Sequence, residues 1–410
     1  MQFLRFSVHS LLKQTVDKKM TILNHRIKLI TLILSTGFAM FAMFFGSGNL
    51  VFPLMVGQIV GEHYWFGMLG FVLTGVMVPF LGLLGVLLNN GSYKNFLSIW
   101  GKKLGFVLAL IMLLLLGPFG VVPRCITVSY GSFVIITDQL PAPFFNLIMA
   151  LCLYALCMNQ NRVVTILGAV LAPLKILSVI FIIIYGILYA SNFSQSLITA
   201  STAFNKGIVK GYQTMDLLAA FFFASFMVRH IRQKTQKAQL EQYALKTSLF
   251  AMLFGGAILS LVYAGLVFLG AAFSEILNAE APEMYLSIIA LYTLGSAGSF
   301  FVSVTIILSC LTTAIALTTV FTEFMHEYVL KKKLSWKATL ALSVSTAYAF
   351  SILGFSSIAS FLGNILSLLY PFLILLTISN LVIWARKHRF HIRNNVVAKK
   401  VTRMTEEKTF

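Results

Sequence analysis

Four consecutive residues, Gly46-Ser47-Gly48-Asn49, have the chemistry to bind a small polar ligand within a long apolar segment. A glycine inside a helix costs about 1 kcal/mol relative to alanine, so this run favours local unwinding. Unwinding frees carbonyl groups at the end of one half-helix and amide groups at the start of the next. The amides favour a carboxylate, and the carbonyls favour an ammonium group or Na+, so the run suits a zwitterion. Glycines at this spacing are also typical of close packing between membrane helices.

A stripe of small, mostly hydroxyl-bearing side chains lies in the apolar segment 298–328. Its members share one helical face within about 40° and are Thr305, Ser309, Thr312, Ala316, Thr319 and Glu323, with Thr313 at the edge. Na+ is a hard cation and prefers oxygen ligands, which hydroxyls and carbonyls supply. The stripe could therefore complete an oxygen cage beside the unwound run. Hydroxyls that bond to carbonyls of their own helix produce the same pattern.

Ionisable residues inside apolar segments are costly in a membrane and are candidates for function. Arg124, Asp216 and Glu323 are such residues, and Lys175 lies in a further apolar segment. Arg124 follows Pro123 and is a candidate partner of Asp216, either in a gate or in a structural ion pair. Glu323 is also consistent with a solvated position near the membrane surface. The neighbours of Lys175 do not decide its role.

Three adjacent phenylalanines, 221–223, form a second apolar feature. Such a run is typical of lipid contact or core packing. One of the three could instead line a pocket for an apolar ligand, and Phe222 is our candidate for that role.

The composition excludes most other classes of protein. Of the 410 residues, 59% are hydrophobic and 10% are charged, whereas soluble domains average about 25% charged residues. The net charge of +19 does not indicate nucleic acid, because the basic residues lie in short segments between apolar runs. The four cysteines lack metal-ligand spacing, and the sequence contains no phosphate-binding loop. We expect an all-α integral membrane protein without a cofactor, a nucleic-acid partner or enzymatic activity.

Ten apolar stretches are candidates to cross a bilayer, which takes about 20 residues. They lie at 28–53, 64–88, 104–137, 143–158, 163–190, 211–229, 243–273, 298–328, 336–353 and 359–385. A further stretch, 284–296, is too short and is predicted as a helix in the loop before the eighth span.

The basic residues predict the orientation. With a cytoplasmic N-terminus, 27 of the 31 lysines and arginines fall on the cytoplasmic side, two lie within spans, and only Lys206 and Lys210 fall outside. This bias follows the positive-inside rule. We therefore expect the basic segment 1–27 and the basic tail 386–410 in the cytoplasm. Met20 is an alternative start of translation.

Ten spans divide into two sets of five, 28–190 and 211–385. Because five is odd, the second set enters the membrane with opposite polarity, an inverted repeat that is common among transporters. Corresponding helices should carry corresponding breaks. Span one is interrupted at 46–49, and span six, its counterpart, opens with the polar run 211–216 (GYQTMD). We expect broken first and sixth helices.

Several motifs resemble one known family. Segment 41–53 (FAMFFGSGNLVFP) resembles the first-helix signature of the bacterial branched-chain amino acid–cation symporters of the BrnQ type. Further matches are spread over five more helices and lie at 75–82 (GVMVPFLG), 117–129 (GP, then VPR and TVS), 211–220 (GYQTMDLLAA), 310–318 (CLTTAIALT) and 370–371 (YP). The resemblance covers roughly 30–385.

The resemblance implies the LeuT-like fold of the amino acid–polyamine–cation superfamily. It also implies import of leucine, isoleucine and valine across a bacterial cytoplasmic membrane, usually with Na+. The sodium ligands that it implies are the carbonyls of Ala42, Phe45 and Ser309 and the hydroxyls of Thr312 and Thr313.

The resemblance further implies that the substrate carboxylate meets amides near Gly48 and Asn49. The ammonium group would meet carbonyls of the first and sixth helices. Together with the candidates from the residue patterns above, the substrate-binding residues that we expect are Phe45, Gly46, Ser47, Gly48, Asn49, Asp216 and Phe222.

One departure and several alternatives stay open. Members of this family usually carry about twelve spans, whereas ten are predicted here, which puts oligomerisation and regulation in question more than chemistry. The same fold could carry methionine or another neutral solute, or use H+, with Asp216 or Glu323 as proton carrier. A channel or a nutrient sensor without coupled transport is the alternative from a different class.

Overall fold

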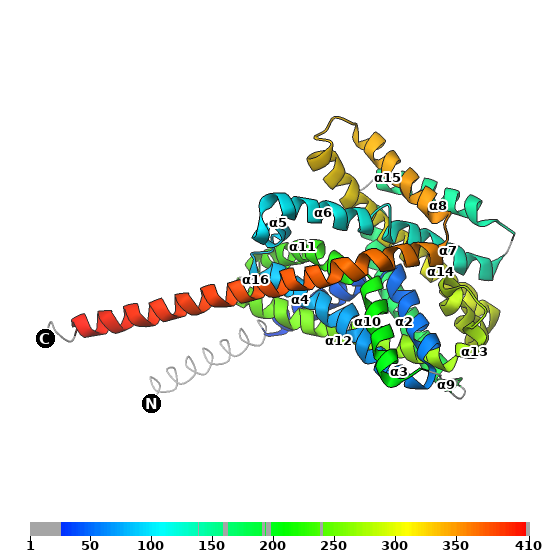
Figure 1. The fold of residues 1–410 in the computed structure, drawn as a ribbon, viewed down its shortest axis with the longest axis horizontal. Helices are drawn as coiled ribbons and strands as arrows, with labels where there is room; N and C mark the ends of the chain where they lie inside the picture. Colours follow the sequence, from blue (N-terminus) through cyan, green and yellow to red (C-terminus); the bar gives the residue numbers. More distant parts are fainter. Residues whose placement is uncertain are drawn as a thin grey trace, which may run out of the picture.

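The computed structural model describes residues 26–137, 139–158, 163–190, 193, 198–237 and 241–406. These residues form helices joined by turns and short connections, and no strand occurs among them (Figure 1). The all-α fold class is confirmed.

The first half of the chain forms the helices of the first predicted repeat. They are the helix Arg26–Phe44, α2 (Ser47–Val60), α3 (Tyr64–Val72), α4 (Val78–Leu88), α6 (Lys102–Leu116), α7 (Val121–Ile136), α8 (Ala142–Met158) and α9 (Val163–Leu188). A π-helical turn, Leu73–Met77, joins α3 to α4, and the short helix α5 (Tyr93–Leu97) precedes α6.

The second half of the chain forms the remaining long helices. They are α10 (Ala200–Gln213), α11 (Asp216–Lys237), α12 (Ala244–Ala272), α14 (Tyr285–Phe324), α15 (Trp336–Ser351) and α16 (Phe355–Glu406), with the short helix α13 (Ser274–Leu277) after α12. α14 is kinked at Gly295, whose φ of 71° suits glycine. The short helix predicted at 284–296 is therefore the first part of α14.

By length and hydropathy, six described helical stretches can each cross a bilayer, or seven if the bent pair α10 and α11 counts as one. The sequence predicted ten spans. The difference has physical causes in particular helices. α8 and α15 have 17 and 16 residues, fewer than the about 20 that cross a bilayer. α9, in contrast, has 26 residues and is long enough to cross. Predicted spans one and two correspond to two of the six stretches, Arg26–Phe44 and Ser47–Leu88, and the second of these turns at Gly61, which has a φ of 50°.

Three predicted spans have different boundaries in the structure. Span one extends to Val60 rather than to residue 53. Span six begins at Ala200 rather than at 211, because α10 is amphipathic and its lysines lower its hydropathy. Lys206 and Lys210 therefore lie in a helix and not in an outside loop. Span three is interrupted at 117–120, between α6 and α7.

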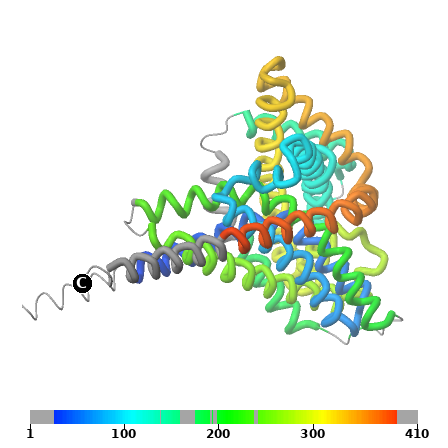
Figure 2. Tube along the Cα trace, turned by 60° about the vertical axis from the view of Figure 1, so that its left-hand side comes forward, coloured from blue at the N-terminus to red at the C-terminus, as the bar shows by residue number. Residues whose placement is uncertain are grey.

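Glycines bring two helix pairs into backbone contact. A Cβ atom added to Gly57 of α2 would overlap the carbonyl oxygen of Val267 in α12. A Cβ atom added to Gly207 of α10 would overlap the carbonyl oxygen of Gly67 in α3. Small residues permit such close approach in membrane helices. Figure 2 shows the blue helices α2 and α3 beside the green α10.

The packing is consistent with the predicted inverted repeat. α2, the second half of span one, packs on α12 of span seven. α11, the second half of span six, packs on α4 of span two. α7 and α14, from spans three and eight, pack against each other. An inverted repeat relates span one to span six, span two to span seven and span three to span eight. It therefore relates the contact of α2 with α12 to that of α11 with α4, and it maps the contact of α7 with α14 onto itself.

Apolar side chains lie on both the inside and the outside of the bundle. One large cluster of buried apolar side chains runs through its centre. Leu253, Leu261 and Leu368 are among many large apolar side chains exposed on its surface. An apolar exterior around a packed helical interior suits a lipid bilayer, in which helices satisfy their own backbone groups.

Candidate functional site

The first helix is interrupted at Phe45 and Gly46, which we call the first break. The next three residues, Ser47, Gly48 and Asn49, form the buried first turn of α2. Amides in a first turn have no acceptor within their helix. Asn49 caps the turn, because its Oδ1 accepts a hydrogen bond from the Gly46 amide at 3.0 Å. The break predicted from the sequence is therefore present, with amides available beside it.

The sixth helix is interrupted at Thr214 and Met215, which we call the second break. α10 and α11 meet there at an angle of 45°. Met215 has a φ of 63°, which is uncommon for a residue with a side chain. The Thr214 hydroxyl accepts a hydrogen bond from the Asp216 amide at 3.4 Å. The sixth helix is thus broken as predicted, but in its middle rather than at its edge.

The two breaks lie against each other. A Cβ atom on Gly48 would lie 3.5 Å from the Cα of Thr214. The Nδ2 of Asn49 donates to the Oδ2 of Asp216 at 2.6 Å, and the Tyr263 hydroxyl donates to the same oxygen at 3.0 Å. Asn49 and Tyr263 are also in contact. This buried network joins the first turn of α2 to the first turn of α11.

α14 lies beside the first break. A Cβ atom on Gly46 would lie 3.3 Å from the Cγ2 of Thr313. The hydroxyls of Thr312 and Thr313 donate to the carbonyl of Ser309 at 2.8 Å and 3.1 Å. Donation leaves lone pairs on the hydroxyl oxygens, which can still bind a cation. The Ser309 carbonyl already accepts two hydrogen bonds, and Ala42 lies half-buried one turn before the break.

Lys175 of α9 places its ammonium group on the first break. Its Nζ donates a hydrogen bond to the carbonyl oxygen of Phe45 and lies 5.3 Å from the centre of the Phe45 ring. The residue is only 5% exposed. A positive charge of the protein itself therefore binds one of the carbonyls that the family resemblance assigns to Na+.

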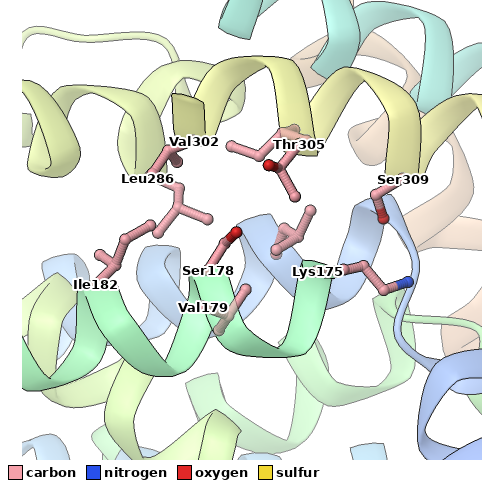
Figure 3. A pocket seen from close by; sticks show the side chains of 10 residues that line it. Lys175, Ser178, Val179, Ile182, Leu286, Val302, Thr305 and Ser309 are labelled. Carbon is pink, nitrogen blue, oxygen red and sulfur yellow. The ribbon is translucent and has the colours of Figure 1, made fainter. Parts of the chain in front are cut away.

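A small cavity lies between α2, α9 and α14, next to Lys175 (Figure 3). It has room for about one water molecule. Lys175 and Ser178 face Thr305 and Ser309 across it. The Oγ of Ser309 is buried and has no hydrogen-bond partner within the described part of the chain. These polar side chains surround the cavity, but the surface that they expose to it is apolar.

Arg124 is fully buried in the first turn of α7. Its Nη1 donates to the carbonyl of Gln213, the last residue of α10, at 2.7 Å. Its guanidinium carbon lies 5.4 Å from the centre of the Phe52 ring. Arg124 and Asp216 interact electrostatically, but the hydrogen bonds of the Asp216 side chain come from Asn49 and Tyr263. The structure therefore brings the predicted pair near each other and gives each residue other hydrogen-bonding partners.

Phe222 and Phe223 contact different aromatic rings. The ring centre of Phe222 is 5.1 Å from that of Tyr93 in α5, between the second and third spans. The adjacent Phe223 contacts Phe44, one residue before the first break. Phe223 therefore packs beside the residue that precedes the first break.

The sequence matches the family described as branched-chain amino acid transport protein over residues 30–406. The chain is 30% identical over 354 residues to the branched-chain amino acid permease BrnQ of Corynebacterium glutamicum, covering 85% of this chain and 80% of that protein. It is 30% identical over 360 residues to the permease BraB of Bacillus subtilis, covering 84% and 79%. The chain belongs to the branched-chain amino acid transport protein family.

The fold agrees with this membership. The structure is similar to the inward-facing conformation of Mhp1, with a TM-score of 0.61 and 12% identity over 85% of this chain and 76% of that one. The family and the LeuT-like fold expected from the sequence are confirmed. This member of the branched-chain amino acid transport family is a multi-pass membrane transporter and not an enzyme.

The contacts of two residues beside the breaks were not evident from the sequence of this transporter. Tyr263 is a single hydroxyl-bearing ring in a long apolar helix, a pattern that is typical of packing. Lys175 was noted as an ionisable residue in an apolar segment that could either snorkel or pair. Their contacts with Asp216 and Phe45 depend on how α9 and α12 pack against the breaks, which periodicity within one helix does not reveal.

Proposed function

We propose that this protein imports leucine, isoleucine and valine across the bacterial cytoplasmic membrane by symport with a cation. The observation that carries the proposal is the pair of helix breaks joined through Asn49 and Asp216, in a member of the branched-chain amino acid transport family. The relatives BrnQ and BraB are both named branched-chain amino acid permeases, which supports the substrate class. The free amides of the first turn of α2 suit a substrate carboxylate.

Transport would proceed by alternating access. The breaks lie where the two predicted repeats meet, so movement of one repeat against the other would open the site to one side at a time. The positive-inside bias supports a cytoplasmic location for both termini. Lys206 and Lys210 of α10 would then lie in the outer half of the sixth helix.

Na+ is the first candidate for the coupling cation. The carbonyls of Ala42 and Phe45 and the hydroxyls of Thr312 and Thr313 are its proposed ligands, and the Ser309 carbonyl is a further one. Binding of Na+ would order the first break and thereby raise the affinity for the substrate. Thermodynamic linkage then requires that the substrate raise the affinity for Na+ by the same factor.

The position of Lys175 favours a second candidate, proton coupling. An ammonium group and Na+ separated by about 4 Å repel each other by about 4 kcal/mol at an effective dielectric constant of about 20. Protonated Lys175 and Na+ therefore compete for the Phe45 carbonyl. Na+ binding would require Lys175 to lose its proton or move away. A proton on Lys175 could also serve as the coupling ion itself.

Counterflow tests the substrate class without an imposed ion gradient. Proteoliposomes are loaded with unlabelled leucine, diluted into a trace of labelled leucine with Na+ on both sides, and compared with liposomes lacking protein. We expect the label to accumulate transiently, and external isoleucine or valine to block the accumulation while lysine and glutamate do not. Block by methionine but not by isoleucine or valine would change the proposed substrate class to one that includes leucine and methionine and excludes the other branched-chain amino acids. Absence of exchange with any of these amino acids would contradict the proposal.

A further inference from the structure

Arg124 has more hydrogen-bonding capacity than the protein uses. A guanidinium group carries five N–H donors, and Nη1 of Arg124 serves the carbonyl of Gln213. Its Nε and Nη2 are buried and have no hydrogen-bond partner within the described part of the chain. Leaving a buried charge incompletely paired is strongly destabilising. Capping the end of α10 takes one donor, so this role does not account for a fully buried guanidinium.

The unpaired donors have the geometry of an anion site. Nε and Nη2 lie along one edge of the planar guanidinium, and such an edge binds both oxygens of a carboxylate. Arg124 also lies in the first turn of α7, where the helix dipole is already positive. That position disfavours a cation alone and favours a bound anion. Two independent features therefore make this point attractive to a carboxylate.

The surroundings of Arg124 contain a further unpaired polar group. The Oε1 of Gln213 is buried without a partner in the described residues. Tyr370 of α16 interacts electrostatically with both Arg124 and Asp216. A positive side chain, a negative side chain and spare hydrogen-bonding atoms thus gather at the second break. The ring of Phe52 covers the guanidinium from another side.

We propose that Arg124 binds the carboxylate of the amino-acid substrate and that Asp216 receives its ammonium group. This inference rests on the proposed function and deepens it. Two buried side chains of opposite charge then bind the two charged groups of a free α-amino acid, in addition to the helix ends. A ligand that lacks one of these charges leaves one buried side-chain charge without its partner, which the low-dielectric interior penalises.

The test compares leucine with leucinamide, which keeps the ammonium group and the side chain but lacks the carboxylate. Calorimetric titration of the purified full-length protein in detergent gives the dissociation constant of each ligand. We expect wild-type protein to bind leucine about 100-fold more tightly than leucinamide. In Arg124→Gln this ratio should fall below about fivefold, because leucine loses affinity and leucinamide does not.

Two further variants keep the test decisive. Lys210→Gln is the matched control, because Lys210 Nζ lies 5.8 Å from the same Phe52 ring and its removal should leave the ratio unchanged. Arg124→Lys keeps the buried charge without the two-nitrogen edge, and the ratio should fall at least about fivefold there as well. Equal weakening of both ligands in the Arg124 variants would overturn the inference and leave the proposed function intact. Absence of leucine binding by wild-type protein would instead overturn the proposed function.

Discussion

Asn49 and Asp216 are 167 positions apart in the sequence, yet the Nδ2 of Asn49 lies 2.6 Å from the Oδ2 of Asp216. Each residue belongs to the first turn of a helix that follows a break. The Oδ1 of Asn49 holds the amide of Gly46, so one side chain connects the first break to α11. The second halves of the first and sixth helices are therefore coupled as long as this hydrogen bond persists.

Removing this hydrogen bond should destabilise the protein in a non-additive way. A hydrogen bond to a charged group contributes about 1.5–3 kcal/mol. Because Asn49→Ala and Asp216→Ala remove the same bond, the double variant should lower the unfolding temperature in detergent by less than the sum of the single changes. Asn49→Ala combined with Thr293→Ala should be additive, because the Thr293 hydroxyl donates to the Ile289 carbonyl of its own helix. Additivity in the first pair would show that the bond contributes little.

The hydroxyls beside the first break should matter for Na+ and little for folding. Thr312→Ala with Thr313→Ala should raise the Na+ concentration for half-maximal leucine uptake by about tenfold or more, because two oxygen ligands are lost. Thermal stability should change little, since within the described part of the chain both hydroxyls bond only to the Ser309 carbonyl of their own helix. Thr346→Ala, which removes a similar bond on the exposed side of α15, is the control. Unchanged activation by Na+ would exclude this cation site.

Lys175→Met should reveal whether the Lys175 ammonium group and Na+ compete for the Phe45 carbonyl. Loss of the ammonium group removes its repulsion of Na+, which amounts to several kcal/mol. Wild-type Lys175 avoids part of this repulsion by moving away or by losing its proton. We expect the half-maximal Na+ concentration of uptake to fall by about tenfold in this variant. If protons are the coupling ion, Lys175→Met should lose the uptake that a proton gradient drives, while leucine counterflow continues. Unaltered responses to both ions would contradict any role for Lys175 in coupling.

Close packing of α12 on α2 predicts opposite outcomes for two glycines of one helix. A Cβ atom on Gly270 would overlap the carbonyl oxygen of Leu54, whereas one on Gly256 meets nothing nearer than Phe80 at 3.4 Å. Gly270→Ala should therefore lower the unfolding temperature and the yield of monodisperse protein. Gly256→Ala should be neutral or stabilising, because alanine favours helix by about 1 kcal/mol. Equal effects would show that the backbones of α2 and α12 are not in close contact.

The sequence predicted the parts of the site that depend on local chemistry. Glycines and a polar side chain at 46–49 favour unwinding whatever surrounds them, so the first break was predictable. The helix α10 was missed because hydropathy underestimates an amphipathic helix carrying Lys206 and Lys210. The interruption at 117–120 was visible only as a glycine and a proline that loosen a helix.

Contacts between distant helices could not be predicted in the same way. The spacing of residues in α14 placed hydroxyls on one face, but the partner of that face depends on tertiary packing. The hydrogen bond from Lys175 to Phe45 and the network around Tyr263 likewise join helices far apart in the chain. Family resemblance supplied the regions of the proposed cation site, and it gave no indication of the lysine beside them.

Concentrative uptake of labelled leucine into proteoliposomes tests cation-coupled import most directly. Uptake is measured with an inward Na+ gradient, with an inward proton gradient, and with each gradient collapsed by an ionophore. We predict that the Na+ gradient drives leucine transiently above its external concentration and that the ionophore abolishes this accumulation. Full replacement of Na+ by the proton gradient would assign coupling to the second candidate. Saturable leucine entry that never exceeds the external concentration under either gradient would contradict symport.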